Sequence, residues 1–222
     1  AEAARRAPAI AHAVNVEGTG RLTDWCRHLG RRIVYTSTDL VFDGSAPWRK
    51  ETDPAQPILE YGRSKRAAEP AVLDVPRGLV ARLSLLFGPS RNGRASYFDR
   101  TLKSWKKGEP QTFFEDEFRT PLDLDSAALI LVNLLESEVT GVVHVGGPER
   151  LSRFDLMRRV AEAMGLDPAL VRSNRQQDAD LPEPRPADVS LDTARLLDLM
   201  PDLSRPSIET VVSRFEFAPS TS

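Results

Sequence analysis

The sequence predicts an α/β fold built on a mainly parallel sheet. Short apolar runs alternate along the chain with segments of helical spacing, which implies right-handed crossovers between parallel strands. The runs at 33–36 and 142–145 are apolar without alternation, as is typical of strands covered on both faces. A length of 222 residues and a hydrophobic content of 41% fit one sizeable core, or one domain with a smaller lobe.

The first elements expected are a helix and a strand. Between Pro8 and about Leu29 the apolar residues follow a loose helical spacing, with a polar interruption at Gly18 to Gly20. Residues 31–37 are β-branched and aromatic after two charges, which predicts a strand.

A polar, proline-bearing loop at roughly 43–57 should lead into a helix at 59–75. Pro70 should kink or shorten this helix, because proline removes a backbone hydrogen bond. Residues 78–83 predict a second strand. Beyond it we expect a helix near 96–107, a short strand at 111–114, a helix at 123–136, a strand at 142–145 and a helix at 152–164.

The last quarter of the chain differs in composition from the rest. The segment 174–189 is polar and carries three prolines, which predicts a loop. Two short helical patterns follow at 193–200 and 207–215, and the tail 218–222 should be frayed.

Earlier in the chain, Glu115-Asp116-Glu117 predicts a solvated turn. Trp105 and Phe113-Phe114 predict core or lobe packing.

Composition and charge argue against several classes of protein. The net charge of −2 provides no field to hold nucleic acid or an anionic membrane. No apolar run approaches the roughly 18 residues that span a bilayer. The single cysteine, Cys26, cannot form an internal disulfide, and the three histidines lack metal-ligand spacing, so no metal site is predicted. We therefore expect a cytoplasmic protein without nucleic-acid or membrane partners. Because the chain opens at Ala1 directly into helical sequence, we also expect a fragment, or a protein without its beginning.

Two segments carry a pattern for proton transfer. Thr38 follows the strand predicted at 31–37, while Tyr61 and Lys65 lie four residues apart on one face of the predicted helix. A free tyrosine, with a pKa of about 10, is a poor acid or base at neutral pH, and a neighbouring ammonium lowers that pKa by roughly one to three units. With Thr38 donating to the same substrate oxygen, the three residues form a general acid or base beside a carbonyl or alcohol.

These segments resemble the extended short-chain dehydrogenase/reductase superfamily, and within it the dTDP-4-dehydrorhamnose reductases and their relatives. The likeness covers nearly the whole chain. It is carried by Ser-Thr-Asp-Leu-Val-Phe-Asp-Gly at 37–44 and Tyr-Gly-Arg-Ser-Lys at 61–65, and by the segments 13–19, 47–53, 82–89, 118–121 and 185–192.

The resemblance implies a role for several residues. Thr38 would polarise the sugar carbonyl and Tyr61 would donate the proton. Lys65 would bind the nicotinamide ribose and hold down the pKa of Tyr61. Asn15 would order a water molecule in the proton relay.

Two further residues are implied in substrate binding. Asp39 would hydrogen-bond the substrate. Leu85 stands where the reductases commonly have a tryptophan, so the usual stacking contact with the substrate is altered.

The implied fold is the C-terminal part of a Rossmann-like doubly wound parallel sheet with a small α+β substrate lobe. Residues 1–90 would be the remaining part of an NAD(P)-binding domain with the catalytic residues. Residues 91–222 would be mainly the substrate lobe, with a helix and a strand at about 123–146 returning to the sheet. The implied activity is hydride transfer from NAD(P)H to a 4-keto nucleotide-linked deoxysugar, in a homodimer.

The family's front end is missing from this sequence. The family begins with a strand, a glycine-rich turn and a helix whose N-terminus binds the pyrophosphate. Gly18-Thr19-Gly20 follows no strand, and Gly146-Gly147-Pro148 predicts a structural turn. We therefore expect the strand at 32–37 to lie on an open edge, and the chain alone to bind dinucleotide poorly.

Two other functions remain open. An NAD-dependent sugar-nucleotide epimerase or dehydratase would use the same threonine, tyrosine and lysine. Alternatively, the chain is a non-catalytic regulatory or binding subunit, since the regulatory subunit of methionine adenosyltransferase also resembles this family.

Overall fold

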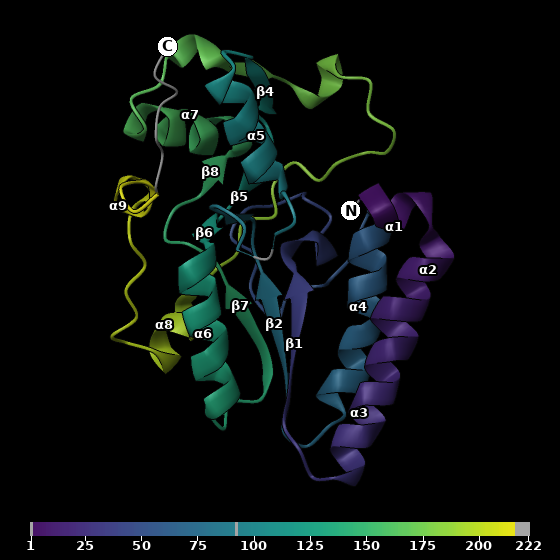
Figure 1. Cartoon of the computed structure of the whole chain (residues 1–222). Coiled ribbons are helices and arrows are strands. Elements are labelled where there is room, and N and C mark those ends of the chain that lie inside the picture. Colours follow the sequence, from purple (N-terminus) through teal and green to yellow (C-terminus); the bar gives the residue numbers. More distant parts are fainter. Residues whose placement is uncertain (1, 92, 216–222) are drawn as a thin grey trace.

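A three-stranded parallel sheet forms the centre of the molecule (Figure 1). The computed structural model describes residues 2–91 and 93–215. The strands β1 (Ile33–Thr38), β2 (Gly78–Leu83) and β7 (Gly141–Val145) lie in the order β1-β2-β7. Thr38 pairs with Leu83, and Leu83 with Val145, so the carboxyl ends of all three strands meet at one edge of the sheet. The α/β class and the parallel sheet are confirmed.

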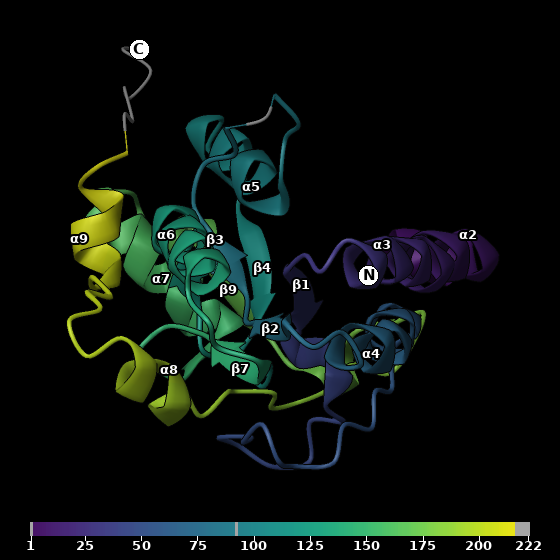
Figure 2. The same ribbon diagram turned by 90° about the horizontal axis from the view of Figure 1, so that it is seen from below.

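Helices cover both faces of the sheet (Figure 2). Helix α4 (Glu60–Leu73) packs on one face, and α6 (Leu124–Glu136) on the other. Asp123 caps α6 by accepting a hydrogen bond from the backbone of Ser126. The core under α6 consists of buried aliphatic side chains from the sheet, from β6 (Leu122–Asp123), from α6 and from α8 (Ala194–Leu199), namely Leu79, Ala81, Leu122, Ala127, Ile130, Leu134, Val143, Val145 and Leu196.

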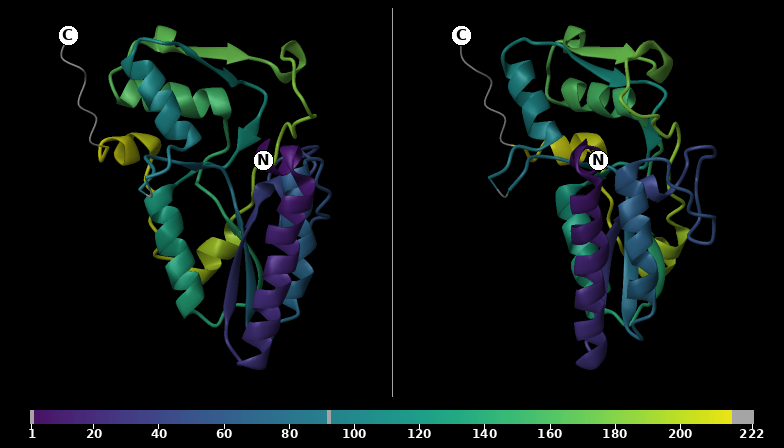
Figure 3. Two further views of the ribbon diagram at one scale, coloured as in Figure 1. Left: turned by 45° about the vertical axis from the view of Figure 1, so that its right-hand side comes forward. Right: turned by 90° about the vertical axis from the view of Figure 1, so that its right-hand side faces the viewer.

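The open edge expected for the first strand is confirmed. Among the described residues β1 pairs only with β2, so its other edge has no strand partner. The helical segment that precedes β1 lies beyond this edge and runs beside α4 (Figure 3).

The N-terminal segment is a helical rod with a break at Ala7, and the helix runs on through Gly18 to Gly20, so the interruption expected there is wrong. The helix stays intact there because Thr19 and Thr23 are buried on its inner side, next to α4. The irregularity falls earlier, at a π-helical turn, η1. The rod consists of α1 (Glu2–Arg6), α2 (Pro8–His12), η1 (Ala13–Glu17) and α3 (Gly18–His28).

Pro70, which was expected to kink or shorten α4, does not end the helix. The helix continues through it to Leu73. Ala68 and Val72 are buried against the sheet on either side of Pro70, and this burial offsets the hydrogen bond that the proline removes.

A lobe lies above the carboxyl ends of the strands (Figure 3). Its core contains Phe98, Trp105, Phe113 and Met157, so the packing roles expected for Trp105 and Phe113 are confirmed. Strand β9 pairs with β4 in parallel over a segment for which the sequence predicted no strand. The lobe contains α5 (Tyr97–Lys106), β4 (Gln111–Phe114), α7 (Arg153–Ala163), η3 (Pro168–Leu170), β9 (Val171–Asn174) and η4 (Gln176–Asp178).

Short elements connect the lobe to the sheet. They are η2 (Asp39–Val41), β3 (Leu86–Phe87), β5 (Phe118–Arg119), β6 (Leu122–Asp123), β8 (Leu151–Ser152), α8 (Ala194–Leu199) and α9 (Ile208–Val212). None of the helices within 2–91 and 93–215 is both long and apolar enough to cross a bilayer. The same residues contain no cluster of three or more metal-ligating side chains. The tail expected to be frayed lies outside the described residues.

Gly147 has a structural reason to be glycine, as expected for this turn. A Cβ there would lie 1.8 Å from the carbonyl oxygen of Pro121. The backbone of the turn after β7 therefore lies in direct contact with the backbone of the segment that leads into α6.

A buried histidine should make stability depend on pH. The His144 ring is 0% exposed, stands edge-on to Phe42, and burial lowers its pKa to about 4. The unfolded chain has the ordinary value of about 6.5, so it binds a proton first as the pH falls. We expect the free energy of unfolding to fall by about 3 kcal/mol between pH 7 and pH 4. Urea unfolding across this range measures it.

Replacing His144 by asparagine should remove this part of the dependence of stability on pH. The same replacement of the exposed His28 is the control and should leave it in place. An unchanged dependence in His144→Asn would contradict the assignment.

Candidate active site

A cleft of about 350 Å³ lies where the carboxyl ends of β1 and β2 meet the lobe. Residues from the sheet, from α4 and from the lobe all contribute to its wall. It is lined by Thr36, Ser37, Thr38, Asp39, Leu40, Tyr61, Lys65, Leu83, Ser84, Leu85, Leu86, Arg119, Arg153 and Arg185. Five of the six residues predicted for the site therefore lie in this one cleft, and Asn15 is the exception.

Thr38 ends β1 and begins the 3₁₀ turn η2. Its hydroxyl accepts a hydrogen bond from the Leu40 backbone at 3.3 Å and donates to the Asp39 carboxylate at 3.3 Å. Ser84 donates to the other oxygen of Asp39 at 3.1 Å. Asp39 is thus a buried acceptor that orients Thr38 and Ser84, and both of its carboxylate oxygens accept hydrogen bonds from within the protein.

Tyr61 is positioned by a close approach of α4 to the turn after β1. The next residue, Gly62, is buried, and a Cβ at this position would lie 2.1 Å from the carbonyl oxygen of Leu40. Only glycine permits this approach, which brings Tyr61 to the same cleft as Thr38.

We expect Gly62→Ala to lower the free energy of unfolding by about 1–3 kcal/mol, because an overpacked backbone contact must open. Urea unfolding provides the measurement. Gly20→Ala in α3 is the matched control, since a Cβ there meets nothing within 4 Å. It should leave stability unchanged or raise it by up to about 1 kcal/mol. Equal effects of the two substitutions would contradict the close approach.

The surroundings of Tyr61 favour its protonated form. Burial raises its pKa, and the carboxylate of Asp39 raises it further. The direction is opposite to that expected from the charge of Lys65. A phenol with a raised pKa carries its proton at neutral pH and can donate it.

The ammonium of Lys65 rests on the ring of Tyr35, which explains its weak influence on Tyr61. Its Nζ lies 4.2 Å from the centroid of that ring. Burial lowers the pKa of Lys65, and Glu69 opposes this effect. Within the described part of the chain this ammonium has no hydrogen-bond or ion-pair partner, so its donors are free to bind a ligand.

Asn15 lies behind Tyr61. It stands on the π-helical turn η1, and its Nδ2 donates to the Ser64 hydroxyl at 2.9 Å. Ser64 in turn donates to the carbonyl oxygen of Tyr61 at 2.9 Å. Asn15 therefore contacts α4 beneath the tyrosine and does not line the cleft; its role in ordering a water stays a prediction.

The lobe side of the cleft contains a buried ion network that the sequence did not predict. Glu117 is 0% exposed, so the solvated turn expected at 115–117 is wrong at this residue. Burial alone would raise the pKa of Glu117, but Arg119, Arg153 and Arg185 outweigh it and lower that pKa to about 2. The motif segments 118–121 and 185–192 signalled Arg119 and Arg185, but nothing local indicated that they share one carboxylate.

The site continues into an apolar cleft of about 300 Å³, which shares Leu85, Leu86 and Arg153 with the first. Tyr97, Phe98 and Met157 contribute to its walls.

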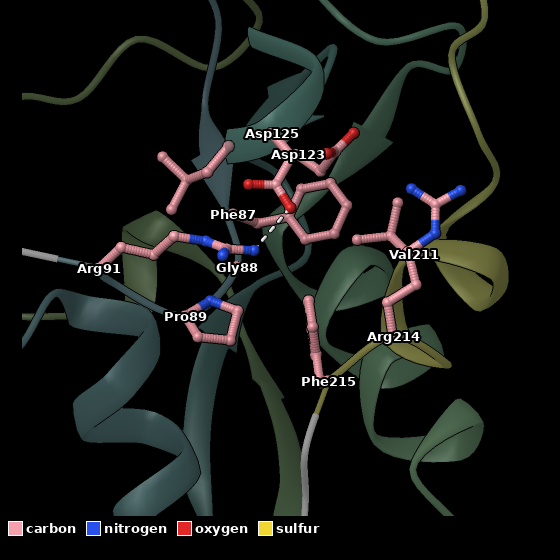
Figure 4. Close-up of a pocket in the computed structure, with 10 residues that line it drawn as sticks. Phe87, Gly88, Pro89, Arg91, Asp123, Asp125, Val211, Arg214 and Phe215 are labelled. Carbon is pink, nitrogen blue, oxygen red and sulfur yellow. Dashed lines mark hydrogen bonds and ion pairs between the residues drawn. The ribbon is translucent and has the colours of Figure 1, made fainter. Parts of the chain in front are cut away.

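A further cleft of about 350 Å³ adjoins it at Phe87 and Gly88 (Figure 4). Here Arg91 forms an ion pair with Asp125 at 2.8 Å, and Arg214 and Phe215 lie across the opening. Its charges are of both signs, so it does not extend the positive wall of the first cleft.

A parallel sheet with a tyrosine and a lysine one helical turn apart at its carboxyl edge defines a Rossmann-like protein of the short-chain dehydrogenase/reductase type. The chain belongs to the family described as "RmlD substrate binding domain", whose model matches residues 1–216.

Curated relatives agree with this family. The chain is 32% identical over 218 residues to a probable low-salt glycan biosynthesis reductase Agl14 of Haloferax volcanii, covering 95% of this chain and 71% of that protein. It is 31% identical to a dTDP-4-dehydrorhamnose reductase of Mycolicibacterium smegmatis, covering 85% and 58%. It is 27% identical to methionine adenosyltransferase 2 subunit beta of Bos taurus, again covering 85% and 58%. The chain thus spans between somewhat over half and about 70% of these relatives.

Solved structures share the fold. A dTDP-4-dehydrorhamnose reductase from Bacillus anthracis in complex with NADP superposes with a TM-score of 0.85 at 23% identity, covering 96% of this chain and 74% of that one. A hypothetical dTDP-4-dehydrorhamnose reductase from Sulfolobus tokodaii superposes with a TM-score of 0.79 at 29% identity, covering 91% and 71%.

Proposed function

We propose that this chain is the catalytic and substrate-binding part of a reductase that transfers a hydride from NAD(P)H to a 4-keto nucleotide-linked deoxysugar. The observation that carries the proposal is the single cleft in which Thr38, Tyr61 and Lys65 face three arginines. The proton-transfer groups suit a carbonyl, and the arginines suit an anionic carrier attached to it.

In the proposed reaction, Thr38 turns its hydroxyl from Asp39 to the carbonyl oxygen of the sugar and polarises it. As hydride reaches the carbonyl carbon, Tyr61 transfers its proton to the oxygen, which completes the alcohol and leaves a phenolate. Lys65, once it leaves the Tyr35 ring, stabilises that phenolate by its charge. Ser84 and Arg119 hold Asp39 in place beside Thr38.

The residues of the cleft fit the nicotinamide end of the cofactor. The Lys65 ammonium, which rests on the Tyr35 ring, is suited to ribose hydroxyls, and Leu85 and Leu86 supply an apolar wall of the same cleft. When bound, NAD(P)H supplies the hydride.

The same proposal assigns different roles to the two parts of the chain. Residues 1–90 would provide the catalytic side, and residues 91–222 mainly the substrate side, with the apolar cleft near Tyr97 and Phe98 receiving the nucleoside. A cytoplasmic location and a homodimer stay predictions from the sequence.

The proposal is tested by supplying the chain with a dTDP-linked 4-keto-6-deoxysugar and saturating NADPH or NADH, then following cofactor absorbance and product together. We expect one reduced cofactor to be consumed for each alcohol formed. Product without net consumption of cofactor would indicate the epimerase or dehydratase instead.

The chain's likeness to methionine adenosyltransferase 2 subunit beta favours one further candidate, a binding subunit that uses this fold without turnover. Tight binding of a partner protein without any reduction at saturating cofactor and substrate would support that candidate and contradict the reductase.

A further inference from the structure

One buried carboxylate organises the arginines of the cleft. Glu117 accepts two hydrogen bonds from Arg185, at 2.8 and 3.0 Å, and one from Arg119 at 2.9 Å. Arg153 approaches the same carboxylate at 3.7 Å. The three arginines come from a loop, from β5 and from the first turn of α7, so a single side chain joins three separate segments of the lobe.

The network reaches the proposed reaction centre through Arg119. One end of its guanidinium pairs with Glu117, and its Nη1 lies 3.2 Å from the Asp39 carboxylate, which accepts a hydrogen bond from Thr38. Glu117, Arg119 and Asp39 are all buried, so water competes little for these contacts.

Arg153 and Arg185 differ from Arg119 in their exposure. Their side chains are 19% and 31% exposed, and both line the cleft. Both guanidiniums are therefore open to the cleft, while Glu117 holds Arg185 by two hydrogen bonds and Arg153 by the ion pair at 3.7 Å. Tyr97 adds a second support for Arg153, whose guanidinium carbon lies 5.1 Å from its ring centroid.

We propose that Glu117 is a positioning residue that fixes Arg153 and Arg185 for the phosphates of the substrate, although it touches no ligand itself. This inference rests on the proposed function. As a charge alone, Glu117 would repel a phosphate, and its removal would tighten anion binding. As a positioning group it has the opposite effect, because two flexible guanidiniums lose their shared anchor and must be ordered by the ligand.

The sign of the change in affinity separates these two roles. The experiment measures binding of dTDP and of thymidine to the full chain by calorimetry, for the unaltered protein and for Glu117→Gln. We expect dTDP to bind about tenfold more weakly to the variant than to the unaltered protein, because its charge-assisted contacts are no longer pre-ordered. The affinity for thymidine should change by no more than about twofold. A general loss of structure would weaken both ligands alike. Circular dichroism verifies that the variant is folded, and Glu117→Asp, which keeps the charge but shortens the reach to Arg185, is expected to show the same selective loss.

Glu149→Gln is the matched control. It removes a carboxylate that pairs at 2.8 Å with Arg159, which lies on α7 as Arg153 does. Neither Glu149 nor Arg159 lines the cleft. Both ligands should bind it as they bind the unaltered chain. Unchanged or tighter dTDP binding by Glu117→Gln, or equal weakening of both ligands, would overturn the positioning role and leave the proposed function standing. Failure of the unaltered chain to bind dTDP would overturn the proposed substrate class, and the inference with it.

Discussion

Replacing Tyr61 by phenylalanine should reduce turnover by about 100- to 10,000-fold, the usual contribution of a positioned general acid. The hydroxyl group is the only part of the residue that this change removes, so the shape of the cleft and the packing of α4 should remain. KM for the nucleotide sugar should change little, because the lost contact matters most as the alkoxide forms. Initial rates of cofactor oxidation at saturating NAD(P)H provide the measurement.

Tyr35→Phe is the matched control for Tyr61→Phe. It makes the same chemical change at a tyrosine that does not line the cleft. The change removes a hydroxyl that lies 3.5 Å from the Lys65 carbonyl oxygen and keeps the ring on which the Lys65 ammonium rests. Its turnover should stay within a few-fold of the unaltered chain. If Tyr61→Phe retained full turnover, another group would have to donate the proton and the proposed role of Tyr61 would be wrong.

Replacing Glu69 by alanine should destabilise the protein by about 3–5 kcal/mol, the range for a buried ion pair that loses one partner. Glu69 is 1% exposed and receives two hydrogen bonds from Arg82, at 3.0 and 2.8 Å, and one from Ser37 at 2.6 Å. Without it, the Arg82 guanidinium would stay buried, facing the ring of Phe42, with no counter-charge. Chemical denaturation at neutral pH measures the loss.

The control for Glu69 is Glu138→Gln. Glu138 pairs with Arg77 at the surface, where both side chains are largely exposed, and such pairs add little to stability. We expect no measurable change. A loss in Glu69→Ala no greater than that in the control would mean that Arg82 finds another partner or water.

The sequence was most successful for features of the fold and of the cleft that depend on local spacing. Tyr61 and Lys65 share a helix face because they are four residues apart, and Thr38 follows an apolar strand that has to enter a sheet. Strand pairing and Gly62 then bring the two segments together, and both features depend on contacts between positions far apart in the chain.

The sequence was less successful where a residue's environment comes from distant segments. Glu117 lies in a run of three acidic residues that is typical of a solvated turn, yet arginines from three segments surround it. Pro70 was expected to kink or shorten its helix, and Gly18 to Gly20 to interrupt theirs. Both helices continue through these residues, because tertiary packing outweighs a local penalty of about 1–3 kcal/mol. The strand β9 was missed because its pairing with β4 gives it regular structure that its own polar sequence does not favour.

By itself, the sequence determined the class of fold and most of the order of its helices and strands, and it named Thr38, Tyr61 and Lys65 as the candidates for proton transfer. These follow from periodicity and from motifs confined to a few neighbouring residues. Only the tertiary structure decided where Lys65 rests, that Asn15 lies behind Tyr61, and that one buried carboxylate holds the arginines of the cleft. The physical reason is that burial and charge pairing are set by side chains brought together from remote parts of the chain, and these determine pKa values and ligand-binding geometry.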